Sequence, residues 1–207
     1  MTFFSKMIET PSYIGKNIKH LLSGDEDHNK LMVLLPGRGY YVDAPLLHYT
    51  RKLGWSLGYD VLSLVYGFQA TQQGLNSADL PGIQQECRLA IETVLASGYD
   101  EVVLVGKSLG TPMAALFANE IPAVTKAILL TPIQNCHKLI ESTPALAVIG
   151  TADPVWEDGI AVDSAFVTWR VFADLDHSLE YLDDVAASIR VLGEIMQACK
   201  TFLTTPI

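Results

Sequence analysis

Short apolar runs recur along the chain at intervals that suit a layered fold. Residues 31–35 (LMVLL) are apolar throughout and stop at Pro36. Similar runs follow at 61–65, 102–105, 127–130, 145–149 and 166–172. A strand that is apolar at every position must be covered on both faces, so these runs predict the strands of a buried parallel sheet.

Segments with helical spacing lie between several of these runs. Three segments repeat apolar residues every three or four positions: Leu46, Thr50, Leu53 and Leu57; Ile83, Cys87, Ala90, Ile91 and Val94; and Leu182, Val185, Ile189, Leu192 and Met196. Strand and helix therefore alternate. The alternation predicts an α/β fold with a doubly wound, mostly parallel sheet of about six or seven strands and helices on both faces.

The length of the chain fits a single domain over residues 1–207. A chain of 207 residues is close to the usual size of one domain, and no repeat or linker divides it. The core is expected over 31–203. Residues 1–30 have a weaker pattern: the polar stretch 24–30 predicts an exposed loop, and one extra strand at the sheet edge is expected before it.

Charge and hydropathy narrow the classes of partner. The net charge is −9 and no cluster of five or more Lys and Arg occurs, which argues against nucleic acid and anionic membrane surfaces as partners. No apolar run has the length that a membrane span needs. We expect a small-molecule partner, no nucleic acid and no membrane, and the sequence leaves a homodimer open.

The cysteines do not indicate a metal site or a disulfide framework. Cys87, Cys136 and Cys199 are odd in number and widely spaced. A reducing, cytoplasmic location fits this pattern, and we expect neither a metal ion nor a cofactor.

The clearest chemical signal is a G-x-S-x-G pattern between a predicted strand and a predicted helix. It reads Gly106-Lys107-Ser108-Leu109-Gly110. A sharp turn there lifts the serine above the sheet and leaves no room for side chains two residues to either side, which explains the two glycines. The context predicts Ser108 as a nucleophile, and Lys107 is expected to turn aside from the pocket.

Gly106-Lys107-Ser108 also matches the end of a P-loop motif. That motif requires a further glycine five residues before Gly106, and that position is Glu101. A phosphate-binding loop is therefore excluded.

A serine hydroxyl needs a base to remove its proton and a carboxylate to orient that base. His177 follows the last predicted strand, at the sheet edge where the active sites of open α/β sheets lie. Asp153 follows the run 145–149 at the same edge, although an ordinary Asp-Pro turn is the alternative. The remaining candidates for the acid are Asp158, Asp174 and Asp176.

These residues resemble the α/β-hydrolase superfamily, in which the triad follows the chain order Ser, Asp, His. The similarity extends from Leu31 to Phe202 and rests on Pro36-Gly37-Arg38-Gly39, on the turn around Ser108, and on the strand ends that carry Asp153 and His177. More specifically, the chain looks like the small lidless serine hydrolases of the dienelactone-hydrolase and carboxylesterase type.

The resemblance implies a fold without a large cap. Members with caps usually insert them after the strand that corresponds to 127–130. Here only the 14 residues from Thr131 to Pro144 separate that strand from the next. This is enough for a loop and too short for a helical cap.

The resemblance also implies an oxyanion hole built from the backbone N–H groups of Arg38 and Leu109. If the loop is shifted by one residue, Gly39 takes the place of Arg38. The family loop usually begins His-Gly, and here Pro36 replaces the histidine, so the bonds that support the loop must differ. Substrate contacts are expected from residues near the same edge: Gly39, Tyr40, Tyr66, Phe68 and Trp156.

The expected function is hydrolysis of a small ester or thioester through an acyl-enzyme on Ser108, with His177 as base and Asp153 orienting it. Two alternatives remain open. One is an acyltransferase that uses the same triad, and the other is a non-catalytic binding protein on the hydrolase scaffold.

Overall fold

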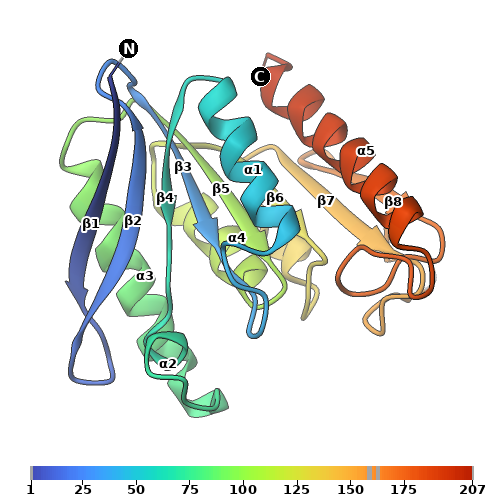
Figure 1. Cartoon of the computed structure of the whole chain (residues 1–207), viewed down its shortest axis with the longest axis horizontal. Helices are drawn as coiled ribbons and strands as arrows, with labels where there is room; N and C mark the ends of the chain where they lie inside the picture. Colours follow the sequence, from blue (N-terminus) through green and yellow to red (C-terminus); the bar gives the residue numbers. More distant parts are fainter. Residues whose placement is uncertain (1, 158–159, 162–163, 207) are drawn as a thin grey trace.

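One eight-stranded sheet forms the centre of the computed structural model, which describes residues 2–157, 160–161 and 164–206 (Figure 1). The strand order is β1-β2-β4-β3-β5-β6-β7-β8. The last six strands of the sequence are parallel to one another. They are β3 (Lys30–Leu35), β4 (Tyr59–Ser63), β5 (Glu101–Lys107), β6 (Val124–Leu130), β7 (Ala145–Gly150) and β8 (Val167–Phe172). The six apolar runs therefore form the parallel sheet that the sequence predicted.

The first 25 residues add two strands where the sequence predicted one. β1 (Phe3–Pro11) and β2 (Asn17–Asp25) form an antiparallel hairpin, and β2 pairs antiparallel with β4. The sequence pattern did not reveal β1, because most of its side chains face solvent at the sheet edge and it contains no continuous apolar run. The predicted loop at 24–30 is shorter than expected, since β2 continues to Asp25.

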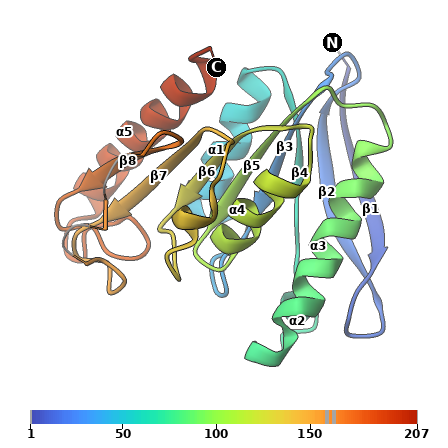
Figure 2. The ribbon, with the colours of Figure 1, turned by 180° about the vertical axis from the view of Figure 1, so that it is seen from behind.

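Helices cover both faces of the sheet, as the sequence predicted (Figure 2). α1 (Pro45–Ser56) and α5 (Val185–Thr204) pack on one face, while α3 (Leu80–Leu95) and α4 (Gly110–Glu120) pack on the other. Each face has its own apolar core. Three shorter helices lie in connections: α2 (Gly67–Ala70), η1 (Ser77–Asp79) and η2 (Cys136–Leu139).

α5 differs from its prediction in both its start and its buried face. It begins at Val185, because the carboxylate of Asp184 accepts the N–H of Ala187 at 2.8 Å and caps the helix. Its buried side chains recur every fourth residue: Val191, Ile195, Cys199 and Leu203. The predicted apolar face is offset from this one and starts with Leu182, which is 88% exposed.

The segment that could have held a cap folds down beside α4. Asn119 donates to the carbonyl of Leu139 at 2.5 Å, and Thr143 donates to the carbonyl of Ala118 at 2.8 Å. Both contacts are near the carboxyl end of α4, away from the serine that precedes its amino end. The start of the segment lies nearer the serine, since the N–H of Ile133 donates to the hydroxyl of Thr111 at 3.2 Å. The only helix in the segment is the short η2, so among the described residues no helical cap covers the carboxyl edge of the sheet, as expected.

Within the described residues, no helix combines the length and the apolar character needed to cross a bilayer.

Candidate active site

Ser108 occupies a strained turn between β5 and α4. Its φ is 49°, in the left-handed region that residues with a side chain rarely adopt. A Cβ on Gly106 would lie 2.5 Å from the carbonyl oxygen of Gly110, and a Cβ on Gly110 would lie 2.2 Å from that of Leu35. Only glycine fits at either position, so the two glycines of the motif are explained by close packing of backbone.

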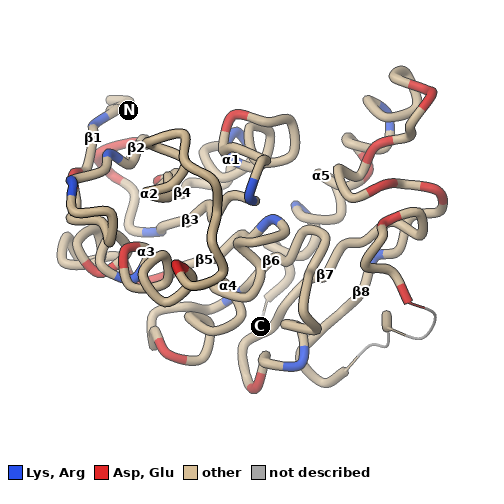
Figure 3. The backbone as a smooth tube through the Cα atoms, turned by 90° about the horizontal axis from the view of Figure 1, so that it is seen from below, with Lys and Arg blue, Asp and Glu red and all other residues tan. Residues whose placement is uncertain are grey.

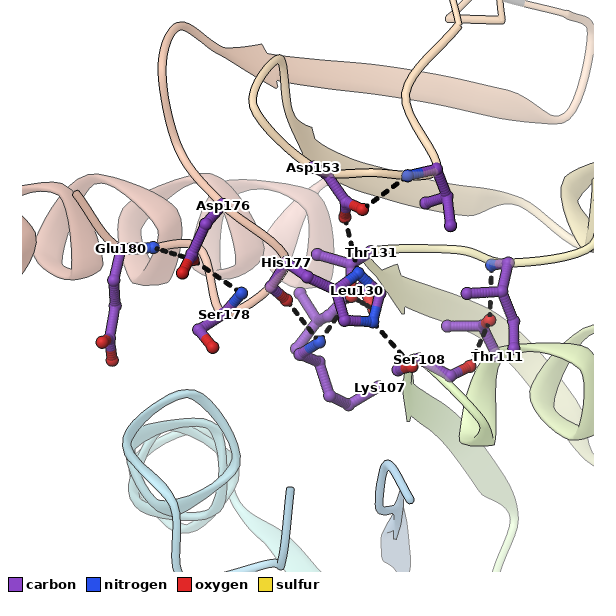
Figure 4. A network of polar contacts seen from close by, with 12 residues as sticks. Lys107, Ser108, Thr111, Leu130, Thr131, Asp153, Asp176, His177, Ser178 and Glu180 are labelled. Atoms are coloured by element: carbon purple, nitrogen blue, oxygen red, sulfur yellow. Dashed lines mark hydrogen bonds and ion pairs between the residues drawn. The ribbon is translucent and has the colours of Figure 1, made fainter. Parts of the chain in front are cut away.

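A continuous chain of hydrogen bonds joins the serine, the histidine and the aspartate (Figure 4). The Nε2 atom of His177 lies 2.8 Å from the Oγ atom of Ser108. On the other side of the ring, Nδ1 lies 2.7 Å from Oδ2 of Asp153. The Asp153 side chain is fully buried, while the His177 side chain is 37% exposed and can be reached from solvent.

Contacts between two loops bring the histidine and the aspartate together. The N–H of Ala152 donates to the carbonyl of Leu175 at 3.0 Å, and a Cβ on Gly150 would lie only 2.1 Å from the same oxygen. The second carboxylate oxygen of Asp153 accepts the N–H of Val155 at 2.9 Å. The loops after β7 and β8 are thus locked against each other.

Of the alternative acids, Asp174 and Asp176 make other contacts in the part of the chain that the structure describes. Oδ1 of Asp176 accepts the N–H groups of Ser178 and Glu180 and shapes the turn after the histidine. The backbone N–H of Asp174 bonds to the hydroxyl of Thr151. Asp158 lies outside the described residues.

Two side chains support the loop that follows β3 from below. The hydroxyl of Tyr66 donates to the carbonyl of Pro36 at 2.8 Å, and Nε2 of Gln69 donates to the carbonyl of Gly37 at 2.8 Å. The sequence signal was weak, because a tyrosine and a glutamine after a strand have no motif of their own.

The loop after β3 runs past the serine, and the N–H of Gly37 within it donates to the carbonyl of Tyr40 at 2.9 Å. A Cβ on Gly37 would lie 3.4 Å from Cβ of Ser108, so the two segments are in contact. Within residues 2–157, 160–161 and 164–206, the backbone N–H groups of Arg38, Gly39 and Leu109 donate to no protein acceptor. These three N–H groups are therefore free of protein partners in the described part of the chain, and their role as oxyanion donors stays a prediction.

Two of the predicted substrate contacts lie in the core instead. Tyr66 is 0% exposed and Phe68 is 4% exposed, and their rings stack with centroids 5.7 Å apart. The reason is that α2 begins directly after Tyr66 and turns both rings towards α3. The other predicted contacts stay near the site: Gly39 is exposed, while Tyr40 and Trp156 are half-buried.

Lys107, expected to be a packing residue or a surface contact, is buried. It is 1% exposed, and its ammonium donates to the hydroxyl of Thr131 and to the carbonyl of His177. Burial lowers its pKa from 10.5 to about 8. Burial also raises the pKa of the neighbouring Tyr40 to about 12, so this phenol stays neutral.

Acidic residues recur along the segment between β8 and α5 (Figure 3). They are Asp174, Asp176, Glu180, Asp183 and Asp184. No Lys or Arg lies between Arg170 and Arg190 in the sequence, so this segment is itself acidic, and the buried ammonium of Lys107 lies beside it at the carbonyl of His177. Among the described residues, no three His, Cys, Asp or Glu side chains are grouped as metal ligands would be.

An apolar groove of about 710 Å³ lies between α1 and α5. Its lining begins at Ser178, one residue beyond the histidine, and continues along α5 to Met196. Three aliphatic side chains with high exposure line it: Leu182 at 88%, Val185 at 77% and Ile189 at 66%. The apolar face that the sequence assigned to the core therefore forms a surface groove.

No family model matches the chain, and no curated protein matches its sequence. Solved structures resemble it along nearly its whole length. A serine hydrolase without a lid from Xanthomonas campestris is 17% identical and has a TM-score of 0.70; the alignment covers 98% of this chain and 97% of that one. An esterase from Pyrococcus furiosus is 15% identical, with a TM-score of 0.71 and coverage of 97% and 92%.

A third similar structure is a dienelactone hydrolase from Anabaena variabilis. It is 14% identical, with a TM-score of 0.71 and coverage of 94% of this chain and 96% of that one. At such identities the likeness concerns the fold. The strand order, the turn at Ser108 and the uncovered carboxyl edge agree with it, and the chain has the α/β-hydrolase fold in its form without a cap.

Proposed function

We propose that the chain is a serine hydrolase that cleaves a small ester or thioester through an acyl-enzyme on Ser108. The observation that carries the proposal is the unbroken chain of hydrogen bonds from Ser108 through His177 to the buried Asp153. Serine becomes a useful nucleophile only when such a base accepts its proton.

Acylation uses the three side chains in turn. Nε2 of His177 takes the hydroxyl proton as Oγ of Ser108 bonds to the acyl carbon, and the carbonyl electrons move onto oxygen. The buried carboxylate of Asp153 keeps the proton of the ring on Nδ1 and stabilises the imidazolium. Backbone N–H groups of Leu109 and of Arg38 or Gly39 hold the oxyanion. Collapse of this intermediate breaks the bond to the alcohol or thiol, which leaves with the proton from Nε2.

Deacylation repeats the same steps with water. His177 takes a proton from the water as its oxygen bonds to the acyl carbon, and the second tetrahedral intermediate releases the carboxylic acid and restores the serine. An exposed fraction of 37% for the His177 side chain gives water access to the acyl group.

The surroundings of the site suit a neutral or cationic substrate of modest size. The five carboxylates between Asp174 and Asp184 disfavour an anionic one. The segment 131–144 begins beside the site, where Thr131 contacts Lys107, and its later part packs along α4 without forming a helical cap. Tyr40 and Trp156, both half-buried, are the aromatic groups that remain available to contact the substrate.

The test combines covalent labelling with turnover. We expect wild-type protein to react with a fluorophosphonate probe and to hydrolyse 4-nitrophenyl acetate. Ser108→Ala should abolish labelling and lower turnover by about 10³-fold or more. Ser97→Ala is the control, since Ser97 is an exposed residue in the turn after α3.

Three other outcomes would decide against parts of the proposal. Folded Ser108→Ala protein with wild-type turnover would remove the mechanism. Absence of both labelling and turnover in the wild type would favour a binding protein. Labelling with product formation only when an added alcohol accepts the acyl group would identify an acyltransferase.

A further inference from the structure

Lys107 sits at the centre of the candidate site without a role in the proton transfer. It is the last residue of β5, directly before Ser108. Its Nζ atom lies 2.5 Å from Oγ1 of Thr131 and 2.7 Å from the carbonyl oxygen of His177 (Figure 4). The ring centre of Tyr40 lies 5.1 Å from the same atom. A lysine buried to 1% exposure is uncommon and calls for a reason.

We propose that Lys107 is a positioning residue that fixes the catalytic histidine through its backbone. This inference rests on the proposed function and adds a fourth side chain to it. Asp153 and Ser108 hold the two ring nitrogens of His177, while Lys107 holds the main chain from which the ring projects. Together, the three contacts fix the position of the imidazole ring relative to Oγ of Ser108.

The link is needed because the loop after β8 has few other ties to the nucleophile. β5 and β8 are separated in the sheet by β6 and β7, so no backbone hydrogen bonds join them. Lys107 bridges this separation from the strand that carries the serine. Thr131, which follows β6, receives the same ammonium and donates its own proton to the carbonyl of Leu130 at 2.8 Å, so its oxygen is oriented to accept.

The cost of burying the ammonium is offset by its acceptors and by nearby negative charge. It has two hydrogen-bond acceptors and the face of Tyr40. The carboxylates of Asp153 and Asp176 favour its charged form and oppose the desolvation. A charge-assisted hydrogen bond holds a carbonyl more firmly than a neutral donor does, which suits a positioning role.

A second buried lysine provides a matched comparison. Lys126, at the opposite end of β6, is 6% exposed and donates to the carbonyls of Phe202, Leu203 and Thr205 at the end of α5. It makes the same kind of contact, a buried ammonium with backbone oxygens, at the edge of the sheet away from Ser108. A substitution of Lys126 therefore measures how the loss of a buried ammonium–carbonyl contact affects stability away from the site.

The test compares Lys107→Met with Lys126→Met and measures kcat and KM for 4-nitrophenyl acetate. We expect Lys107→Met to lower kcat by about 10- to 100-fold with KM within about twofold of wild type, because a small displacement of the base affects the chemical step. Lys126→Met should keep kcat within about twofold. Lys107→Gln, which restores a neutral N–H donor, should recover part of the lost kcat.

Amide hydrogen exchange gives a readout that does not depend on activity. We expect peptides covering residues 173–184 to exchange faster in Lys107→Met than in wild type and to be unchanged in Lys126→Met. Unchanged exchange together with wild-type kcat in folded Lys107→Met would overturn the proposal, as would an equal loss of kcat in both Met variants. Failure of the proposed function is distinguished beforehand, since wild type and Ser108→Ala alone reveal it, and that result would remove this inference too.

Discussion

His20 makes the amino-terminal hairpin sensitive to acid. The ring is 1% exposed on β2, where the N–H of Val65 donates to Nδ1 at 3.2 Å and Nε2 lies 2.9 Å from Oγ1 of Thr10. Because Nδ1 is an acceptor, the proton of the neutral ring must be on Nε2, from which it is donated to Thr10. Protonation of Nδ1 would remove the acceptor for Val65 and bury a charge.

The size of the effect follows from the pKa. Burial lowers the pKa of His20 from 6.5 to about 4. Above the unfolded value both states are neutral, and the full stability is present. As pH falls from there towards the folded value, the unfolded state binds protons that the folded state does not, so stability is lost. The loss attributable to this one ring is about 2 kcal/mol at about pH 5 and about 3 kcal/mol at about pH 4.

Urea unfolding at several pH values measures this contribution. We expect His20→Gln to be less stable than wild type at about pH 7.5, because the buried contacts are disturbed, but to lose about 2 kcal/mol less on acidification to about pH 5. The carboxylates titrate equally in both proteins, so their contribution cancels in the difference.

Parallel curves of stability against pH for wild type and His20→Gln would refute the reasoning. A steeper curve for His20→Gln would do so as well. Either result would mean that the histidine is charged in the folded state and that its two contacts do not depend on the neutral ring.

Two further predictions concern the candidate site. Tyr66→Phe removes the hydroxyl that donates to the carbonyl of Pro36, and we expect kcat to fall about tenfold with little change in KM. Tyr59→Phe is the control: Tyr59 is buried at the opposite edge of the sheet and bonds to Glu101, so its loss should leave kcat unchanged. Catalytic efficiency on 4-nitrophenyl esters should peak at short acyl chains, because without a cap few added methylenes are buried, each of which would otherwise contribute about 0.8 kcal/mol. A steady rise to about twelve carbons that Ile189→Asp abolishes would instead place the chain in the groove between α1 and α5 and would refute the small-ester proposal.

The sequence determined the layered parallel core because its signals are local. A strand such as β3 must be apolar at every position when helices cover both faces, and the turn at Ser108 requires glycine at fixed offsets. The positions of Ser108, Asp153 and His177 were candidates for the same reason, because each residue follows a predicted strand. The outer hairpin was harder to predict, because β1 is mostly exposed and has no apolar run.

Tertiary structure decided what depends on packing between distant segments. Tyr66 and Phe68 were expected in the pocket as aromatic residues near the end of a strand, yet they are buried because α2 turns them towards α3. The buried face of α5 was offset from the apolar pattern, because the helix packs through Val191 and Ile195 and leaves Ile189 in the groove. The sequence left Lys107 open as a packing residue or a surface contact. Only the folded chain brings the carbonyl of His177, 70 residues later, within reach of its ammonium.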